Sequence, residues 1–418
     1  MTDNTKCGFA IDELINATRP LKIGLIDADL LDNGTRHPNL ALLKLSGYCK
    51  DSSIHNYNHD VRLICSYDEI RASLFGAAQS YDILAMSRVF KFTVIPSDIL
   101  SMIERGDIYI GGTGFFEING PKLPDIIEHH HPDYQLYDEY IEKDTNGDES
   151  LKRRRWNDYL NFSIGFTTRG CIRHCGFCVN RELNRVERWS PVSEFLDTTR
   201  KYIYLWDDNI MAASPSVFTK VITDLMATNK PFQFRQGMDI RLMTDEKAEI
   251  LKHAHYYGDY IFAFDHYRLD DPIEAKQVRD TIRGLEVWRR HCLKSTKLYV
   301  LVAYDSLDET DIEGTFYRIK TLMEFGCVPY IMRFEKYVES EYKEMYIQLA
   351  RWCNQPSFFK KKSFRQYCEA NEEYHHAGHS KKDHCACYQA MIDFEAKCPE
   401  IAAKYYDLRF DELNKYNH

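Results

Sequence analysis

Short apolar segments alternate with helical segments along most of this 418-residue chain. Each apolar segment has the length of one buried strand, and the stretches between them are long enough for helices. The alternation favours a parallel sheet covered by helices, because parallel strands are joined by crossovers that are usually helical. In the longer, later part of the chain the predicted strands are residues 163–170, 201–209, 232–242, 260–266, 297–306 and 328–334. Six such strands fit an open or partial barrel, which carries its chemistry at the carboxyl ends of the strands.

A shorter series of strands and helices comes first. Its predicted strands are residues 21–27, 81–86 and 107–114, and its predicted helices are residues 39–50 and 95–106. We therefore predict an α/β chain of four parts. They are a Rossmann-like domain over residues 1–120, a polar connector over 121–160, a partial barrel over 161–350 and a mostly helical, Cys- and His-rich extension over 351–418.

Capping residues locate three helix starts within the barrel region. Ser190 and Ser214 each precede a proline, which suits a capping serine followed by proline at the first helical position. Ser306 and Glu309 have the spacing of a capping box. Each of these signals predicts a helix that follows a strand.

The composition excludes several classes of protein. Hydrophobic residues make up 44% of the chain and charged residues 28%, so the chain can bury a core and is not a disordered tail. The net charge of −9 excludes a chain-wide basic surface for nucleic acid. No apolar run approaches the about 18 residues of a membrane-spanning helix, and the first twenty residues lack the apolar centre of a secretory signal. We therefore expect a cytoplasmic protein with no membrane partner.

Thirteen cysteines are an unusual number for such a chain. Without an export signal they indicate metal binding or catalysis rather than a disulfide framework. Scattered cysteines are interpreted as small buried side chains, and these are Cys7, Cys49, Cys65, Cys292 and Cys327. The other eight form one tight cluster and one loose C-terminal group.

The tight cluster consists of Cys171, Cys175 and Cys178, with the spacing Cys-x3-Cys-x2-Cys directly after the first predicted barrel strand. Three thiolates on one loop can bind three irons of a [4Fe–4S] cluster, which usually has four cysteine ligands. A missing fourth ligand leaves one iron open to a substrate or cofactor. The alternative is a structural zinc site with four Cys or His ligands. His174 could be the fourth, but its position beside Cys175 is poor for a closed tetrahedron.

This loop resembles that of the radical S-adenosylmethionine (radical SAM) enzymes, in which Cys-x3-Cys-x-aromatic-Cys follows the first strand of a partial (β/α)6 barrel. Phe177 occupies the aromatic position, which in that family packs near the adenine. The resemblance implies that S-adenosylmethionine (SAM) binds the open iron of a [4Fe–4S] cluster through its amino and carboxylate groups. An electron from a donor such as flavodoxin or ferredoxin then leads to cleavage of SAM to methionine and a 5′-deoxyadenosyl radical, which abstracts hydrogen from a substrate.

The end of the second predicted barrel strand also resembles this family. Asp207, Asp208 and Asn209 are similar to its Asp-Asp-Asn segment, and this strand end contacts the SAM amino group in the family. A carboxylate suits an ammonium group at such a place. The alternative is a capped turn before the next helix, because Asp and Asn are ordinary turn residues.

The third predicted strand carries Gln236, Asp239 and Arg241, which resemble the third strand of the same subgroup. Polar residues inside a strand are costly unless they line a cavity or pair with each other. We therefore predict that they line the SAM cavity. Asp239 and Arg241 lie two residues apart on one face, so a simple salt bridge is the alternative.

The N-terminal region resembles the cobalamin-binding-like domain of uncharacterised radical SAM proteins of bacteria and phages, a likeness that runs roughly from Lys22 to Cys368. Asp27, Asp29 and His37 lack the Asp-x-His-x-x-Gly spacing of a histidine-ligated corrinoid. We therefore expect the fold without such a ligand. Cobalamin held without a protein ligand, in a radical SAM methyltransferase, is the alternative.

The loose C-terminal group contains Cys353, Cys368, Cys385, Cys387 and Cys398 with His375, His376, His379 and His384. Its spacing fits no metal-binding pattern, so a second metal site and reduced cysteines in a polar tail are both open interpretations.

Two classes of function follow from these patterns. The first is a radical SAM enzyme, and the second is a non-catalytic, metal-stabilised binding or electron-transfer module. No pattern selects the substrate. The basic runs 152–155 and 360–362 are interpreted as solvated faces, with contacts to a nucleic acid or nucleotide substrate as the alternative.

Overall fold

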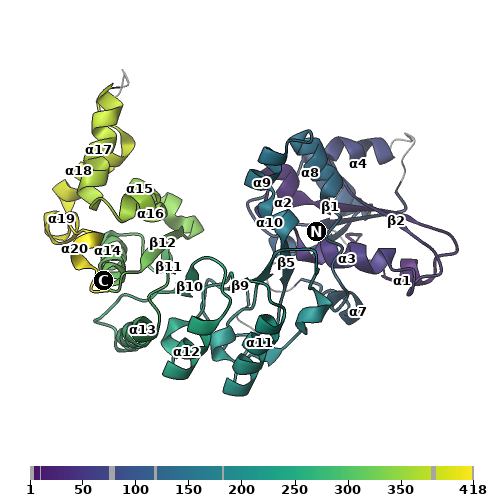
Figure 1. The fold of residues 1–418 in the computed structure, drawn as a ribbon. Helices are drawn as coiled ribbons and strands as arrows, with labels where there is room; N and C mark the ends of the chain where they lie inside the picture. Colours follow the sequence, from purple (N-terminus) through teal and green to yellow (C-terminus); the bar gives the residue numbers. More distant parts are fainter. Residues whose placement is uncertain are drawn as a thin grey trace. The chain divides into compact units, whose positions relative to one another are not determined.

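The computed structural model describes residues 4–9, 11–74, 81–116, 120–180, 183–377 and 383–416 (Figure 1). The chain divides into two compact units. The first comprises Met1–Thr168, Arg173–Leu183 and Arg188–Trp206. The second comprises Arg169–Ile172, Asn184–Glu187 and Asp207–His418. The division falls within the cysteine loop, so each unit carries part of it.

The first unit is built on a parallel sheet with the strand order β2-β1-β3-β4. Its strands are β1 (Lys22–Asp27), β2 (Asp60–Leu63), β3 (Ile83–Ser87) and β4 (Tyr109–Gly111). The sequence predicted β1, β3 and β4. It did not predict β2, a four-residue edge strand with two exposed polar positions that alternate with Val61 and Leu63. Such a short alternating segment is a weak signal beside the continuous apolar run of a central strand.

Successive side chains of the central strands enter two separate cores, because the side chains of a strand alternate between its two faces. Leu25 and Ile83 belong to one core, which α3 covers. Ile26 and Leu84 belong to the other, which α5 covers. The sheet therefore has helices on both faces, as a parallel sheet requires.

The helices of the first unit follow the strands in sequence. They are α1 (Ile11–Ile15), α2 (Ala28–Asp32), α3 (Leu40–Lys50), α4 (Tyr67–Leu74), α5 (Ser97–Arg105), α6 (Thr113–Phe116), α7 (Asp125–Glu128), α8 (Asp138–Thr145), α9 (Glu149–Arg155) and α10 (Asn157–Asn161). Residues 121–160, expected as a connector, contain α7 to α10. Tyr137, Ile141 and Trp156 from this segment lie in the same core as Leu25.

A second pair of parallel strands in the first unit leads to the site. β5 (Phe162–Gly165) pairs with β8 (Tyr202–Leu205). The helix predicted after Ser190 is wrong, because the chain forms only the three-residue 3₁₀ helix η1 (Val192–Glu194) there. Two short strands, β6 (Thr168–Arg169) and β7 (Glu187–Arg188), lie where the chain passes between the units.

The second unit contains the parallel sheet β10-β11-β12. The strands of this unit are β9 (Phe232–Phe234), β10 (Tyr260–Ala263), β11 (Thr296–Val302) and β12 (Val328–Arg333). Isolated bridges pair Phe232 with Tyr256 and Met238 with Phe262. Its helices are α11 (Pro215–Ala227), α12 (Asp245–His253), α13 (Pro272–His291), α14 (Glu309–Glu324), α15 (Lys343–Cys353), α16 (Pro356–Phe359), α17 (Phe364–Ala377), α18 (Ala386–Lys397), α19 (Pro399–Tyr405) and α20 (Phe410–Leu413). Three 3₁₀ helices are η2 (Ile210–Ala212), η3 (Ile240–Leu242) and η4 (Glu335–Glu339).

Two helix starts of the second unit test the capping predictions. Ser214 Oγ accepts a hydrogen bond of 3.4 Å from the Val217 amide, so the prediction for α11 is confirmed. The capping box of α14 is wrong, because Asp308 and not Ser306 is the capping residue. Asp308 Oδ1 accepts from the Thr310 amide at 3.0 Å. A carboxylate nearer the first turn displaces the serine from this role.

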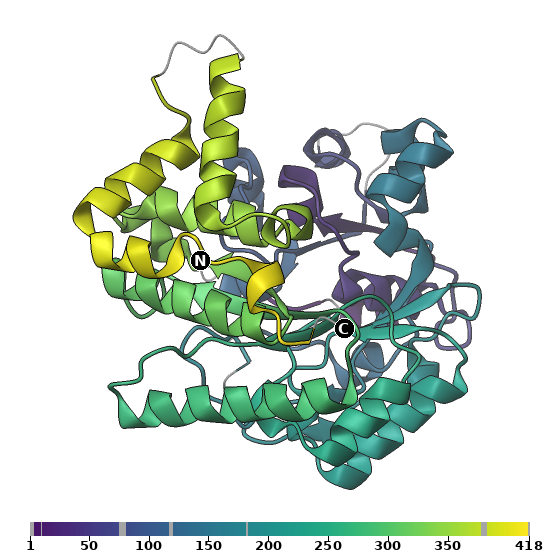
Figure 2. The same ribbon diagram turned by 60° about the vertical axis from the view of Figure 1, so that its left-hand side comes forward.

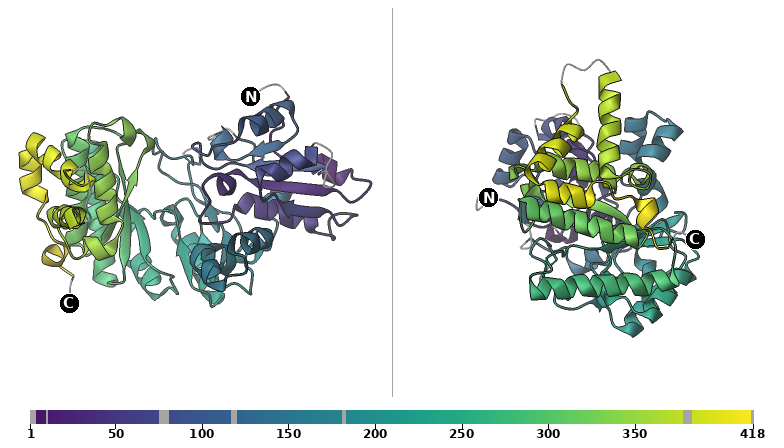
Figure 3. Two further views of the ribbon diagram at one scale, coloured as in Figure 1. Left: turned by 90° about the horizontal axis from the view of Figure 1, so that it is seen from above. Right: turned by 90° about the vertical axis from the view of Figure 1, so that its left-hand side faces the viewer.

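Helices of the second unit pack in neighbouring pairs. The 20-residue α13 packs along α12 (Figure 2). In the C-terminal part α17 and α18 lie side by side (Figure 3). The prediction of an α/β chain with parallel strands is confirmed, and the four-part domain division stays a prediction. Within the described residues, no helix combines the length and the apolar character that crossing a bilayer requires.

Candidate functional site

The candidate site begins at Gly170, between β6 and the first cysteine of the loop. Gly170 has a φ of +104°, which residues with a side chain rarely adopt. A Cβ atom at this position would stand 1.8 Å from the carbonyl oxygen of Arg185. The Gly170 amide donates a hydrogen bond of 2.7 Å to Asp208 Oδ2. Only glycine therefore fits immediately before Cys171.

The predicted strand end at residues 207–209 lies beside this first cysteine within the second unit. Asp208 Oδ2 is 3.4 Å from Arg169 Nε, and the Asp208 side chain is only 3% exposed. Asn209 Nδ2 donates a hydrogen bond of 3.3 Å to the half-buried Cys171 Sγ. Asp207 is also buried.

Asn209 has a second feature that bears on ligand binding. Its Oδ1 atom is buried and has no hydrogen-bond partner among the described residues. A buried acceptor left without a donor costs about 1–3 kcal/mol. Asn209 therefore donates from Nδ2 to Cys171 Sγ, and its Oδ1 atom can accept a hydrogen bond from a ligand.

The other two cysteines belong to the first unit. The Cys178 amide donates to the Cys175 carbonyl oxygen at 2.9 Å, and the Asn180 amide lies 3.4 Å from Cys178 Sγ. Both thiols are half-buried, and Phe177 is 36% exposed. The short turn at Cys175–Cys178 therefore leaves the aromatic ring and both sulfurs within reach of solvent.

The zinc alternative can be compared with the geometry of the first unit. His174 is exposed. Over the part of this unit that the structure describes, His174, Cys175 and Cys178 do not lie close enough together to share one ion. A mononuclear zinc site needs all its ligands about 2.0–2.3 Å from one metal. An iron–sulfur cluster instead binds each thiolate through a different iron.

The polar residues of the third predicted strand do not lie in a strand. β9 ends at Phe234, so the prediction of a strand over residues 232–242 is wrong in its second half. Asp239 caps η3, and its Oδ1 accepts hydrogen bonds from Arg241 N at 3.2 Å and from Arg241 Nε at 2.6 Å. The salt bridge that the two-residue spacing allowed is therefore present, whereas Gln236 is exposed. A capping carboxylate turns the chain into a helical turn here.

Asp27, Asp29 and His37, which the sequence analysis compared with the cobalamin-binding pattern, each contact other segments of the first unit. Asp29 accepts hydrogen bonds from the amides of Val89 and Phe90, at 2.7 and 3.2 Å. His37 Nδ1 lies 3.1 Å from Asp158 Oδ2. These contacts tie together segments of the first unit that are distant in sequence.

Asp27 is the third of these residues and gives a pH-dependent prediction. Burial raises the pKa of Asp27 to about 6, although hydrogen bonds from Tyr137 Oη and the Leu30 amide oppose the rise. The folded chain therefore binds this proton more tightly than the unfolded chain, and the free energy of unfolding falls as pH rises from about 4 to about 6. A shift of about two units corresponds to roughly 3 kcal/mol.

Asp27→Asn is expected to gain roughly 3 kcal/mol in stability relative to the wild type between about pH 4 and about pH 7, because asparagine does not titrate. Urea unfolding of both proteins at the two pH values measures this gain. Asp68→Asn is the control, since the Asp68 side chain is 87% exposed. A difference between Asp27→Asn and the wild type that is the same at both pH values would contradict the prediction.

The C-terminal group is only partly brought together. Cys385 Sγ lies 3.3 Å from Cys387 Sγ. His376 and His384 lie close to Glu372, a residue that the sequence analysis did not single out. The four-residue spacing of Glu372 and His376 could have revealed it, because residues four apart share one face of a helix. His379 lies outside the described residues.

Comparisons with known proteins give few matches. No protein-family model matches the chain, and no curated protein matches it. The chain is similar to a solved structure described as "Structure of Cobalamin-dependent S-adenosylmethionine radical enzyme OxsB with aqua-cobalamin bound", with a TM-score of 0.34 and 14% sequence identity. The similarity covers 95% of this chain and 58% of that one, so the chain spans less than two thirds of its length. At this TM-score the similarity carries no functional inference, and the function of this chain must be inferred from its own residues.

Proposed function

We propose that this chain is a radical SAM enzyme in which Cys171, Cys175 and Cys178 hold a [4Fe–4S] cluster. Together, the bound cluster and SAM would supply reductive cleavage of SAM to a 5′-deoxyadenosyl radical, which abstracts hydrogen from a substrate. The chain itself would hold the cluster, orient SAM and exclude side reactions. The electron would come from a small redox protein such as flavodoxin or ferredoxin.

The observation that carries this proposal is the state of Asn209. Its amide nitrogen donates to Cys171 Sγ, and its buried Oδ1 has no hydrogen-bond partner among the residues that the structure describes. A cysteine that serves as a metal ligand must be a thiolate, and a thiolate sulfur can accept the hydrogen bond that the Asn209 amide donates. The free acceptor suits an ammonium group, and SAM carries one. One side chain therefore fits both the cluster ligand and the cofactor.

The donor set fits an iron–sulfur cluster as well. No disulfide links any two of the thirteen cysteines, so the three sulfurs of the loop are not used in disulfides. Soft thiolate ligands select iron–sulfur clusters, copper(I) or zinc over hard cations such as magnesium. Three thiolates leave one iron of a [4Fe–4S] cluster without a protein ligand, which is where SAM would bind.

The other residues that the sequence analysis assigned to SAM binding fall into two groups, one that positions the cysteine loop and one that is proposed to contact SAM. Asp208 accepts a hydrogen bond from the Gly170 amide and forms an ion pair with Arg169, so we assign it a positioning role at the start of the loop. The proposed contacts to SAM, which depend on the family resemblance, are Phe177, Asp207, Asn209, Gln236, Asp239 and Arg241. The same resemblance supports a cobalamin-binding-like N-terminal domain followed by a partial barrel and a C-terminal extension.

Anaerobic reconstitution with iron and sulfide tests the proposal. We expect about four irons per chain and a brown absorbance. Dithionite and SAM should then yield 5′-deoxyadenosine, detected by chromatography. Zinc as the bound metal, or an iron-loaded protein that releases no 5′-deoxyadenosine, would refute the proposal and favour a metal-stabilised binding or electron-transfer module.

The same assay with added cobalamin separates the two enzymatic interpretations. A methyltransferase would also form S-adenosylhomocysteine, and only when cobalamin is present. An enzyme that does not use cobalamin would give 5′-deoxyadenosine alone, at the same rate with and without it.

A further inference from the structure

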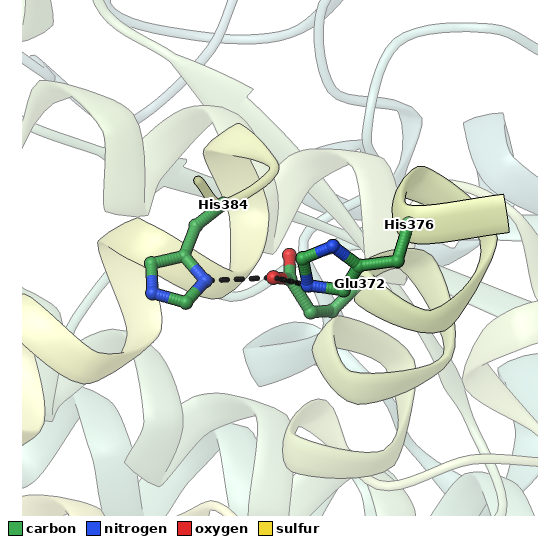
Figure 4. A group of neighbouring side chains, drawn as sticks. All are labelled: Glu372, His376 and His384. Carbon is green, nitrogen blue, oxygen red and sulfur yellow. Dashed lines mark hydrogen bonds and ion pairs between the residues drawn. The ribbon is translucent and has the colours of Figure 1, made fainter. Parts of the chain in front are cut away.

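The C-terminal extension carries a group of side chains with the composition of a transition-metal site. Glu372 and His376 lie on α17, and His384 lies two residues before α18. Figure 4 shows the two imidazole rings directed at the Glu372 carboxylate. One ligand atom from each residue lies within 4.8 Å of the other two. Two imidazoles and one carboxylate therefore converge from α17 and from the residues that precede α18.

The distances within the group are close to those of metal ligands. Glu372 Oε1 is 2.7 Å from His384 Nδ1 and 2.8 Å from His376 Nε2. Ligands about 2.0–2.1 Å from one ion lie roughly 2.9 Å apart in an octahedral site and roughly 3.3 Å apart in a tetrahedral one. The side chains need to separate by only about 0.5 Å, so small rotations would admit an ion.

The carboxylate is held in place by its surroundings. The Glu372 side chain is only 10% exposed, and its Oε2 accepts a hydrogen bond of 2.8 Å from the Cys385 amide. The His384 ring also packs against Tyr388, with 5.2 Å between the ring centres. Contacts of this kind around the ligands of a metal fix their orientation and raise affinity. By contrast, the His376 side chain is 60% exposed, which leaves the site open to an ion from solvent.

We infer that Glu372, His376 and His384 bind a divalent transition-metal ion of the zinc type, with solvent at the remaining positions. Imidazole nitrogen suits zinc and its neighbours in the first transition row, whereas magnesium and calcium prefer oxygen ligands. The ion would join α17 to the residues that precede α18. It is separate from the proposed iron–sulfur cluster, because it shares no ligand with Cys171, Cys175 and Cys178.

Titration of the full-length, chelator-treated chain with Co²⁺ tests this site. Cobalt reports its ligands through its visible absorption. We expect one equivalent to bind with nitrogen and oxygen ligands. Cobalt that the cysteine loop binds in addition is recognised by the charge-transfer absorption of a cobalt–thiolate bond. Zn²⁺ should displace it, and Mg²⁺ should not. Bound cobalt that shows only thiolate charge transfer would overturn the inference.

Variants assign the binding to these residues. Glu372→Gln and the double variant His376→Ala/His384→Ala are expected to weaken Co²⁺ and Zn²⁺ binding by more than about 100-fold, since changes around the ligands alone cost 10–100-fold. His375→Ala, at the adjacent position of α17, is the matched control and should bind as the wild type does. Unchanged affinity in the double variant would refute the site. Iron content, measured in parallel, distinguishes this result from failure of the proposed cluster.

Discussion

Cys171→Ala is expected to lose the iron–sulfur cluster and, with it, the cleavage of SAM. The remaining thiolates of the loop can bind only two of the four irons, and a second iron would then lack a protein ligand. The formation of 5′-deoxyadenosine should fall by more than about 100-fold, because changes outside the metal ligands already cost 10–100-fold. Iron analysis and chromatography of the reaction products measure the two losses.

The fold should survive this change. Cys171 is half-buried, and Asn209 Nδ2 donates a hydrogen bond of 3.3 Å to its sulfur. Cys7→Ala is the matched control. It also replaces a cysteine by alanine, but Cys7 is exposed and lies outside the loop. This control should keep full iron content and activity. SAM cleavage that persists in Cys171→Ala would show that the loop is not the cluster site.

Gly170→Ala is expected to have the second-largest effect, although it adds only one methyl group. A φ of +104° costs a residue with a side chain about 1–3 kcal/mol. The new Cβ would also stand 1.8 Å from the Arg185 carbonyl oxygen, so the backbone must move. Together these effects should destabilise the local structure by about 3 kcal/mol or more. The movement would also break the hydrogen bond from the Gly170 amide to Asp208.

The consequence of Gly170→Ala should be visible in cluster loading. We expect iron content after reconstitution to fall to a small fraction of the wild-type value, while circular dichroism retains the helical signal. Gly111→Ala is the control, because a Cβ there meets no atom within 4 Å and its φ is not positive. Normal iron loading in Gly170→Ala would contradict the assigned role of this glycine.

Sequence reasoning located most of the strands, because continuous apolar runs bounded by turns identify buried parallel strands. β1, β10 and β12 lie within predicted segments, and β3 and β11 each extend one residue beyond theirs. It failed at residues 232–242, where apolar side chains recur at Met238, Ile240 and Leu242 but the strand ends at Phe234 and a 3₁₀ turn begins after Asp239. A side chain such as Asp239 can hydrogen-bond to a nearby backbone amide and so start a helical turn instead of a strand. The pattern of apolar residues does not show which of the two forms.

The candidate site was predicted in part. The cysteines of the loop follow from their spacing, and the proximity of Asn209 to Cys171 agrees with the strand-end argument. The role of Arg185 could not be predicted, because its contact with Gly170 is through a backbone oxygen. Any residue could supply such an oxygen, so no side chain marks it.

The sequence by itself determined the alternation of strands and helices, the spacing of the cysteine loop and the absence of a chain-wide basic surface. Periodicity and short-range spacing are local properties, and a chain expresses them before it folds. Only the tertiary structure decided that Asn209 donates to Cys171 while its own buried Oδ1 meets no donor among the described residues, and that Glu372 lies close to both His376 and His384. Such contacts depend on how distant segments pack, and packing is set by the whole core rather than by any one segment.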